Sequence, residues 1–185
     1  MVIIRPTLSL AKRLKLKLGP TAEKSTTRLG DWYAIDLVLN RRQFILSVSS
    51  TTRLGVMIEA APYLSFPTRL PNKISELILE IGVKDASVTS ELTEMKEVTF
   101  AKTEDRSIIG SMNDYRRHLH HMVQVGRFDL NNPISMSLWL SAMPSLVMEA
   151  VFPQDATLMA FGQPPLKKLV KSPFLLVKPS LFLVK

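Results

Sequence analysis

The chain has 185 residues and is 46% hydrophobic, which supplies the core of one globular domain and excludes disorder along its whole length. It contains no cysteine, which excludes disulfides, thiolate metal sites and cysteine nucleophiles. The net charge is +8, with the basic excess at the two ends of the chain and a slightly acidic middle. A basic surface attracts polyanions such as nucleic acid.

Membrane association is not expected from this sequence. The chain lacks the run of about 18 to 20 apolar residues that a membrane-spanning helix needs. Its first residues include too many lysines and arginines for the apolar core of a signal peptide. Together with the absence of cysteine, these features predict a soluble, cytoplasmic protein.

The first 30 residues combine a short strand, a basic helix and a loop. Residues 2–5 are mostly β-branched, as in a strand. Apolar residues at helical spacing predict a helix over residues 8–18, although residues 13–18 also alternate in the manner of a strand. A Gly-Pro pair ends this segment, and residues 20–30 are expected to form a polar loop.

Three strands are predicted next, rich in aromatic and branched side chains. They cover residues 32–39, 43–48 and 54–60. Asn40, Arg41 and Arg42 form the hairpin turn between the first two of them. The three strands together predict an antiparallel meander.

Four helices and one strand are predicted in the rest of the core. Pro71 favours the start of a helix that Gly82 ends, and its apolar stripe is Ile74, Leu77, Ile78 and Ile81. A weaker helix covers residues 87–95, and residues 97–102 alternate as a strand. Thr103 is the expected cap of a long helix that reaches about Gln124, and a last helix runs from Asn132 to Pro144. We therefore expect a single α+β domain over residues 1–150, with a mainly antiparallel sheet of four to five strands and three to four helices.

The C-terminal extension, residues 151–185, has a different composition. Its last part consists of three near-copies of a seven-residue unit that ends in Leu-Val-Lys, over residues 165–171, 172–178 and 179–185. Prolines inside the copies exclude a continuous helix. We interpret the repeats as a poorly ordered extension. The alternative is a β-like arm that docks on its own sheet or on a protein partner, including a second copy of the chain.

Three segments carry a resemblance to a known family. They are Gly30-Asp-Trp-Tyr33, Asn40-Arg-Arg42 and the long segment Ala101–Asp114. In this combination the chain resembles a family of uncharacterised bacterial proteins catalogued as a domain of unknown function, over about residues 1–145. The resemblance implies one α+β domain and supplies no activity.

Two places in the sequence are candidates for anion binding. Lys102, Arg106 and Asn113 lie at the start of the long helix or on one face of it, where phosphate can meet free backbone N–H groups. The alternative is that these side chains only tie the helix to its surroundings, and Glu104 and Asp105 place negative charge at the same end. These alternatives stay open.

The second candidate is the hairpin with Arg41 and Arg42, near Arg53 in the sequence. Arginine forks suit phosphate or carboxylate groups, and the neighbouring Trp32 and Tyr33 could stack on a base. The alternative is that one arginine pairs with Asp31 or Asp36, while the other is solvated and Trp32 belongs to the core.

A weaker candidate is a metal site. Asp114, His118 and His121 are spaced to share one helix face, and carboxylate with imidazole can hold zinc or another divalent ion. A solvated polar face explains the same pattern, and we favour no metal site. No cofactor motif is present, because the chain lacks a glycine-rich phosphate loop, a dinucleotide fingerprint and a nucleophile elbow.

These observations leave three hypotheses of function. The first is a binding module without catalytic activity that contacts nucleic acid or another polyanion. The second is an interaction protein or a subunit of a homo-oligomer, for example in a defence or toxin–antitoxin system, with the C-terminal tail as its contact. The third is a small metal-dependent hydrolase that uses the Asp/His helix face.

Overall fold

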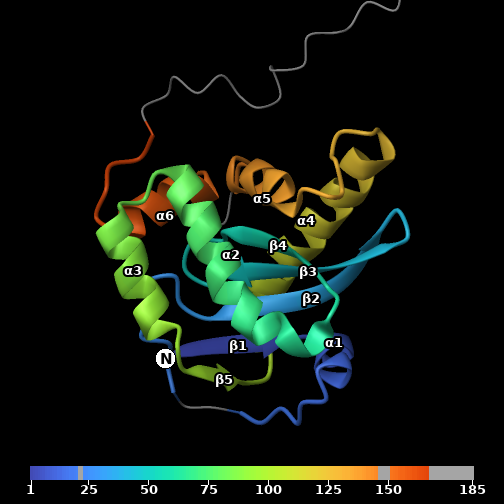
Figure 1. Ribbon diagram of the computed structural model, residues 1–185, viewed down its shortest axis with the longest axis horizontal. Helices are drawn as coiled ribbons and strands as arrows, with labels where there is room; N and C mark the ends of the chain where they lie inside the picture. The colour runs from blue at the N-terminus through green and yellow to red at the C-terminus, as the bar shows by residue number, and fades with distance from the viewer. Residues whose placement is uncertain (21–22, 146–150, 167–185) are drawn as a thin grey trace, which may run out of the picture.

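A computed structural model describes residues 1–20, 23–145 and 151–166 of the chain (Figure 1). The described part contains one five-stranded sheet in the order β4-β3-β2-β1-β5. The strands are β1 (Val2–Pro6), β2 (Trp32–Leu39), β3 (Arg42–Ser49), β4 (Gly55–Glu59) and β5 (Val98–Phe100). The six α-helices are α1 (Leu8–Arg13), α2 (Phe66–Ile81), α3 (Asp85–Glu94), α4 (Arg106–Gln124), α5 (Pro133–Ser141) and α6 (Pro153–Ala160).

The expected α+β domain is confirmed, and its sheet is mixed. The predicted meander of β2, β3 and β4 is confirmed, since both of its pairings are antiparallel. Strand β1 lies between β2 and β5 and pairs in parallel with both. Parallel neighbours need long crossover connections, and the chain supplies one through α1 and its following loop. Local patterns predict strands but not these long-range pairings.

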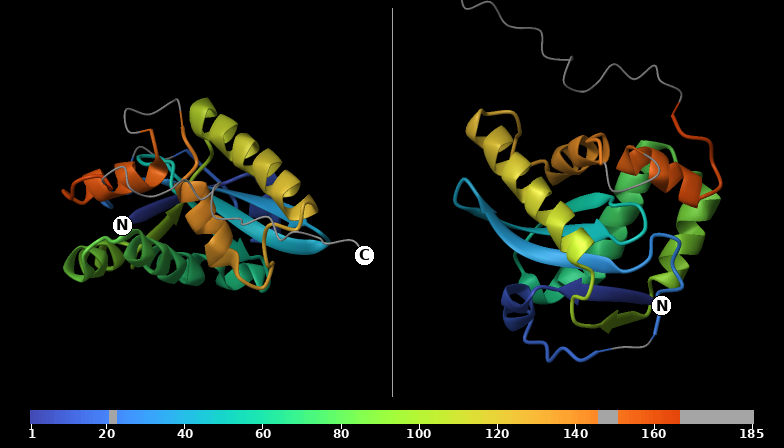
Figure 2. Two further views of the ribbon diagram at one scale, coloured as in Figure 1. Left: turned by 90° about the horizontal axis from the view of Figure 1, so that it is seen from above. Right: turned by 180° about the vertical axis from the view of Figure 1, so that it is seen from behind.

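Alternate side chains of each strand point to opposite faces of the sheet, and each face has its own helical layer (Figure 2). Ile4, Trp32 and Ile45 belong to the layer covered by α1, α2, α3 and α6. Tyr33 and Phe44 belong to the opposite layer, which packs against α4 and α5. The molecule is therefore a three-layer α+β domain with two apolar cores, and it has more helices than the three to four expected.

Helix α2 begins five residues earlier than predicted. Phe66 is its first residue, Pro67 lies in the first turn, and Pro71 lies inside the helix. The predicted apolar stripe is confirmed, because Ile74, Leu77, Ile78 and Ile81 are all buried. The end is confirmed as well: Gly82 has φ +101°, the left-handed conformation that glycine adopts without a steric penalty.

Helix α4 is capped by Asp105 and not by Thr103. The Asp105 carboxylate accepts hydrogen bonds from the backbone N–H groups of Ser107 and Ile108, at 2.7 and 3.3 Å. Aspartate is a strong N-cap because its oxygen replaces the missing carbonyl of a preceding turn. Helical spacing predicts an apolar face of Ile108, Met112, Tyr115, Leu119 and Met122 on this helix, and the first four are buried in the structure.

Helix α1 is shorter than predicted and ends at Arg13, because Lys15 adopts a left-handed backbone conformation with φ +57°. Helix α6 was not predicted; it packs Leu158 against the core, and Phe161 just after it is also buried. The domain boundary at residue 150 stays a prediction. Most of the Leu-Val-Lys repeats fall in residues 167–185, outside the described part. None of the helices in the described ranges is long and apolar enough to cross a membrane.

Helix α5 protects the open edge of β4. The backbone N–H of Met57 points outward from this edge and donates to the Ser137 hydroxyl of α5 at 2.8 Å. Gly55 allows the close approach, since a Cβ at that position would lie 3.0 Å from the Leu140 side chain. The edge N–H is thus satisfied inside the protein and is not offered to another chain.

Candidate functional site

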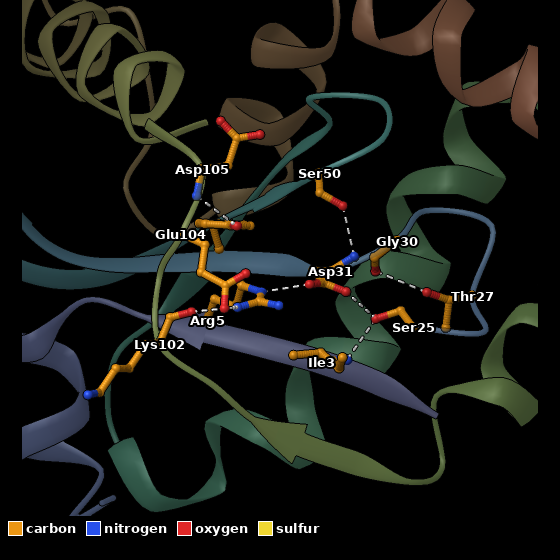
Figure 3. Close-up of polar contacts among 11 residues, drawn as sticks. Ile3, Arg5, Ser25, Thr27, Gly30, Asp31, Ser50, Lys102, Glu104 and Asp105 are labelled. Atoms are coloured by element: carbon orange, nitrogen blue, oxygen red, sulfur yellow. Dashed lines mark hydrogen bonds and ion pairs between the residues drawn. The ribbon is translucent and has the colours of Figure 1, made fainter. Parts of the chain in front are cut away.

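A buried arginine on the interior strand β1 contacts several segments at one end of the sheet (Figure 3). The Arg5 side chain is 6% exposed, and its Nε donates to the Asp31 carboxylate at 2.6 Å. Its Nη1 lies 3.0 Å from the Glu104 carboxylate and donates to the Lys102 carbonyl at 2.6 Å. Burial lowers the pKa of Arg5, but the charges and hydrogen bonds of Asp31 and Glu104 outweigh that effect and raise it.

Two segments of the family resemblance, Gly30–Tyr33 and Ala101–Asp114, meet at Arg5 although they are far apart in sequence. Asp31 is held further by the Ser25 hydroxyl, which donates to it at 2.6 Å. The Asp105 N–H donates to the Tyr33 hydroxyl at 3.2 Å, so the residues 30–33 and 102–105 meet here. Gly30 is required, because it has φ +70° and a Cβ there would lie 2.4 Å from the Ser50 hydroxyl. The network therefore fixes the point at which α4 begins.

Sequence reasoning missed Arg5, although it left a signal. Arg5 follows a run of apolar residues in a strand that is buried between β2 and β5, and a charged residue in a buried strand needs a partner. Its partner Asp31 was considered only as a partner for Arg41 or Arg42. Because the Arg5 guanidinium is turned inward onto carboxylates and a carbonyl, it holds the segment in place and does not present its charge to solvent.

Lys102 and Arg106 lie before and after Glu104, the residue of this segment that pairs with Arg5, and both are exposed. Lys102 contributes its carbonyl to Arg5, and its side chain extends away from the network (Figure 3). Glu104 and Asp105 were an argument against anion binding at this end of α4. In the structure, Glu104 is paired with Arg5, and Asp105 is engaged in capping the helix. Both negative charges are therefore partly compensated.

Helix α4 carries a line of polar side chains on the side opposite its buried face. We call Arg106, Asn113, Arg117 and His120 the α4 polar stripe; their spacings of seven, four and three residues place them on one side of a helix. All four are exposed or partly exposed. At 1.5 Å per residue, the stripe is about 21 Å long. Arg116 is exposed at its flank.

The predicted hairpin reaches the C-terminal half of this helix. Asn40 and Arg41 have φ values of +44° and +66°, as the two central residues of a type I′ turn require. Asn40 lines a shallow hollow of about 300 Å³ together with His120, Val123 and Gln124 of α4. Arg41, next to Asn40, is exposed. The hairpin tip and the end of the α4 polar stripe thus adjoin one another.

The two hairpin arginines have different environments. Arg42 pairs with Glu59 at 2.6 Å and donates to the Asn131 side chain at 2.7 Å. The expected partners Asp31 and Asp36 instead pair with Arg5 and Arg13. Among the residues that the structure describes, no ion pair is formed by Arg41, Arg106 or Arg116.

Two parts of the hairpin hypothesis are wrong. Arg53 does not join Arg41 and Arg42, because it lies in the turn between β3 and β4, at the other end of β3. Trp32 and Tyr33 cannot stack on a base, because both are buried in the core with exposed fractions of 0% and 3%. Aromatic residues on a central strand are buried on both faces, and no local pattern distinguishes them from a surface platform.

The Asp/His face of α4 does not form a metal centre within the described residues, where no group of three such side chains is placed to hold a metal ion. Asp114 pairs with Arg117 one turn away. The His118 ring lies 6.4 Å from the Trp139 ring of α5, measured between ring centroids. Helical spacing put Asp114, His118 and His121 on one side of α4, but other elements would have to supply the remaining ligands.

Comparison with protein families gives a match over most of the chain. A family model described as a domain of unknown function (DUF6933) matches residues 3–156, which extends beyond the region of resemblance seen in the sequence and into α6. No curated protein and no solved structure matches the chain. Because the matched residues make up most of the chain and reach from β1 to α6, the protein belongs to the DUF6933 family.

Proposed function

We propose that this protein binds nucleic acid or another linear polyanion through the α4 polar stripe, with Arg41, Arg116 and Lys102 beside it. The observation that supports this function is that the exposed Arg106, Arg116 and Arg117 lie along α4, with Arg41 of the hairpin near its C-terminal half. Arg41, Arg106 and Arg116 form no ion pair among the described residues, so their charges are available to a ligand.

The length of the surface favours a polymer over a small anion. Arg106 and His120 are separated by about 21 Å along the helix axis, whereas a single phosphate contacts groups within one turn. One strand of B-DNA has a phosphate about every 3.4 Å along the axis, so the α4 polar stripe spans roughly six of them. A single helix lying along a phosphate backbone can therefore use the whole stripe.

The local charge balance also favours an anion. Asp114 is the one acidic residue within α4, and it pairs with Arg117 at the helix surface. Both side chains are more than half exposed, so the pair is weak in water and phosphate oxygens can compete for the guanidinium.

The test is binding of fluorescent DNA and RNA oligonucleotides of mixed sequence, measured by anisotropy across a salt series. With about four phosphate contacts, the slope of log K against log salt is expected to be roughly −4. The triple variant Arg41→Ala/Arg106→Ala/Arg116→Ala should reduce the magnitude of this slope by about 3 and weaken binding to every sequence alike.

A matched control removes the same charge from the opposite face. Lys12, Lys84 and Lys96 are exposed on the side of α1, α2 and α3, and their triple alanine variant should keep the wild-type slope. Equal weakening in both triple variants would mean that only net charge matters, and an absence of binding at low salt would overturn the proposal.

A further inference from the structure

A second buried arginine, Arg53, contacts the start of α4. No carboxylate among the described residues forms an ion pair with it. Arg53 is 8% exposed and sits in the turn between β3 and β4. Its Nη1 donates to the Ser50 carbonyl at 2.6 Å, and its Nη2 donates to the Ser107 hydroxyl of α4 at 3.3 Å. Its buried Nε has no hydrogen-bond acceptor among the described residues.

Arg5 is the other buried arginine at this end of the sheet, and its guanidinium is paired with carboxylates. Arg5 and Arg53 are similarly buried, but Arg5 contacts the carboxylates of Asp31 and Glu104. Within the described ranges, the Arg53 guanidinium donates hydrogen bonds to a neutral carbonyl and a neutral hydroxyl. None of the ion pairs there includes Arg53. Desolvating a charge is costly unless an opposite charge compensates it. One compensating negative charge is thus missing beside Arg53.

The backbone around Arg53 is fixed by contacts that do not involve its charge. Arg53 has φ +57°, the left-handed conformation that is uncommon for residues other than glycine. The buried Tyr115 hydroxyl donates to the Arg53 carbonyl at 2.9 Å, and the Thr52 N–H donates to the Ser49 hydroxyl at 3.0 Å. Burial raises the pKa of Tyr115, which keeps its phenol neutral and able to donate. These contacts hold the turn from which the Arg53 side chain reaches α4.

We propose that Arg53 and Ser107 form a binding site for a small oxyanion, with inorganic phosphate or a phosphomonoester as the ligand class. Ser107 is exposed and lies in the first turn of α4, where the helix dipole favours negative charge. Arg106, also exposed, precedes it. The 3.3 Å hydrogen bond between Arg53 and Ser107 is long, so an oxyanion oxygen can replace it and accept from both groups.

The Asp105 carboxylate limits how the anion binds. It already accepts from the Ser107 and Ile108 N–H groups, so side chains and not these two amides must supply the hydrogen bonds. The site does not rest on the proposed polyanion surface, because neither Arg53 nor Ser107 belongs to the α4 polar stripe. A phosphate group of a polymer has the same chemistry, and the experiment below separates the two sources.

The test is thermal unfolding of the full chain in sodium phosphate and in sodium chloride of equal ionic strength. At phosphate ten times above Kd, linkage predicts that Tm rises by about 3 to 6 °C in phosphate. Ser107→Ala and Arg53→Lys should lose most of this difference, and Ser111→Ala, one turn further along α4, should keep it. Calorimetric titration with phosphate provides the direct readout.

Ser107→Asp keeps the proposal falsifiable if the Arg53 variant fails to fold. A carboxylate at position 107 supplies the missing charge, so this variant should lose the response to phosphate. An oligonucleotide without a terminal phosphate forms a second arm. If phosphate stabilises the wild type and Ser107→Ala abolishes this effect, the result supports a small-anion site. If only the oligonucleotide stabilises the wild type, and Ser107→Ala again abolishes the effect, the site belongs to a polymer. No response to either ligand, or the same response in wild type and Ser107→Ala, would overturn it.

Discussion

At the scale of single residues, the structure is held at one end by Arg5 and Asp31. An aspartate that faces a buried guanidinium contributes more than one that faces an exposed guanidinium, because the buried charge has no water to replace its partner. The Asp31 side chain is 18% exposed and pairs with Arg5, whereas Asp36 pairs with Arg13, which is 44% exposed. These two aspartates offer a matched comparison.

Asp31→Asn should lower the free energy of unfolding by about 2 to 4 kcal/mol, since it leaves Arg5 with Glu104 as its only carboxylate. Asp36→Asn should cost about 0 to 1 kcal/mol. Urea unfolding monitored by tryptophan fluorescence measures both values. Equal costs in the two variants would show that the Arg5 network does not stabilise the fold.

Glu91 gives a prediction for the dependence on pH. Burial raises the pKa of Glu91, although its carboxylate accepts from the Arg28 and Leu29 N–H groups at 3.0 and 3.1 Å. Because the pKa of Glu91 is higher in the folded state, its contribution to the free energy of unfolding is fully present below the unfolded-state pKa. This contribution is lost as pH rises through the folded-state pKa.

The unfolding free energy of the wild type minus that of Glu91→Gln should therefore be larger at pH 4 than at pH 7. Glutamine does not titrate, and the other carboxylates cancel in the difference. Denaturant titrations of both proteins at several pH values provide the measurement. If the difference in unfolding free energy grows with pH, the two backbone hydrogen bonds outweigh burial, and the pKa of Glu91 is lowered and not raised.

At the scale of elements, periodicity predicted what depends on one segment alone. The stripe of α2, the buried face of α4 and the β2–β3 hairpin follow from spacing and turn residues. The starts of α2 and α4 were wrong, because several proline, threonine and aspartate residues compete as caps and tertiary contacts select among them. For the candidate surface, helical spacing put Arg106 and Asn113 together, but Arg41 joins them only through the packing of the hairpin on α4.

The contact of α5 with the edge of β4 is an element-scale feature that can be tested. Ser137→Ala leaves the Met57 N–H without its acceptor, at an expected cost of about 1 to 3 kcal/mol. The Met57 amide should also exchange its hydrogen faster, as NMR can follow. Ser135→Ala is the control, because its hydroxyl donates only to a carbonyl of its own helix at the surface.

At the scale of the whole molecule, both buried arginines act on the start of α4. Arg5 approaches it from β1, and Arg53 approaches it from the β3–β4 turn. Ser50 links them, because its hydroxyl accepts from the Asp31 N–H and its carbonyl accepts from Arg53. This convergence could not be predicted from sequence, since it depends on the parallel placement of β1 between β2 and β5. The contacts of Arg5 and Arg53 together constrain the N-terminal end of α4, which is part of the proposed binding surface.

The placement of β1 also has a consequence for biosynthesis. The strand is made long before β5, one of its two neighbours, with Val2 opposite Val98. At 5 to 20 residues per second, roughly 5 to 20 s pass between the synthesis of β1 and that of β5. One edge of β1 lacks its native neighbour throughout that time. Nascent chains that stop before β5 are therefore the species of this protein that most need chaperones, and full-length chains close the gap as soon as β5 pairs.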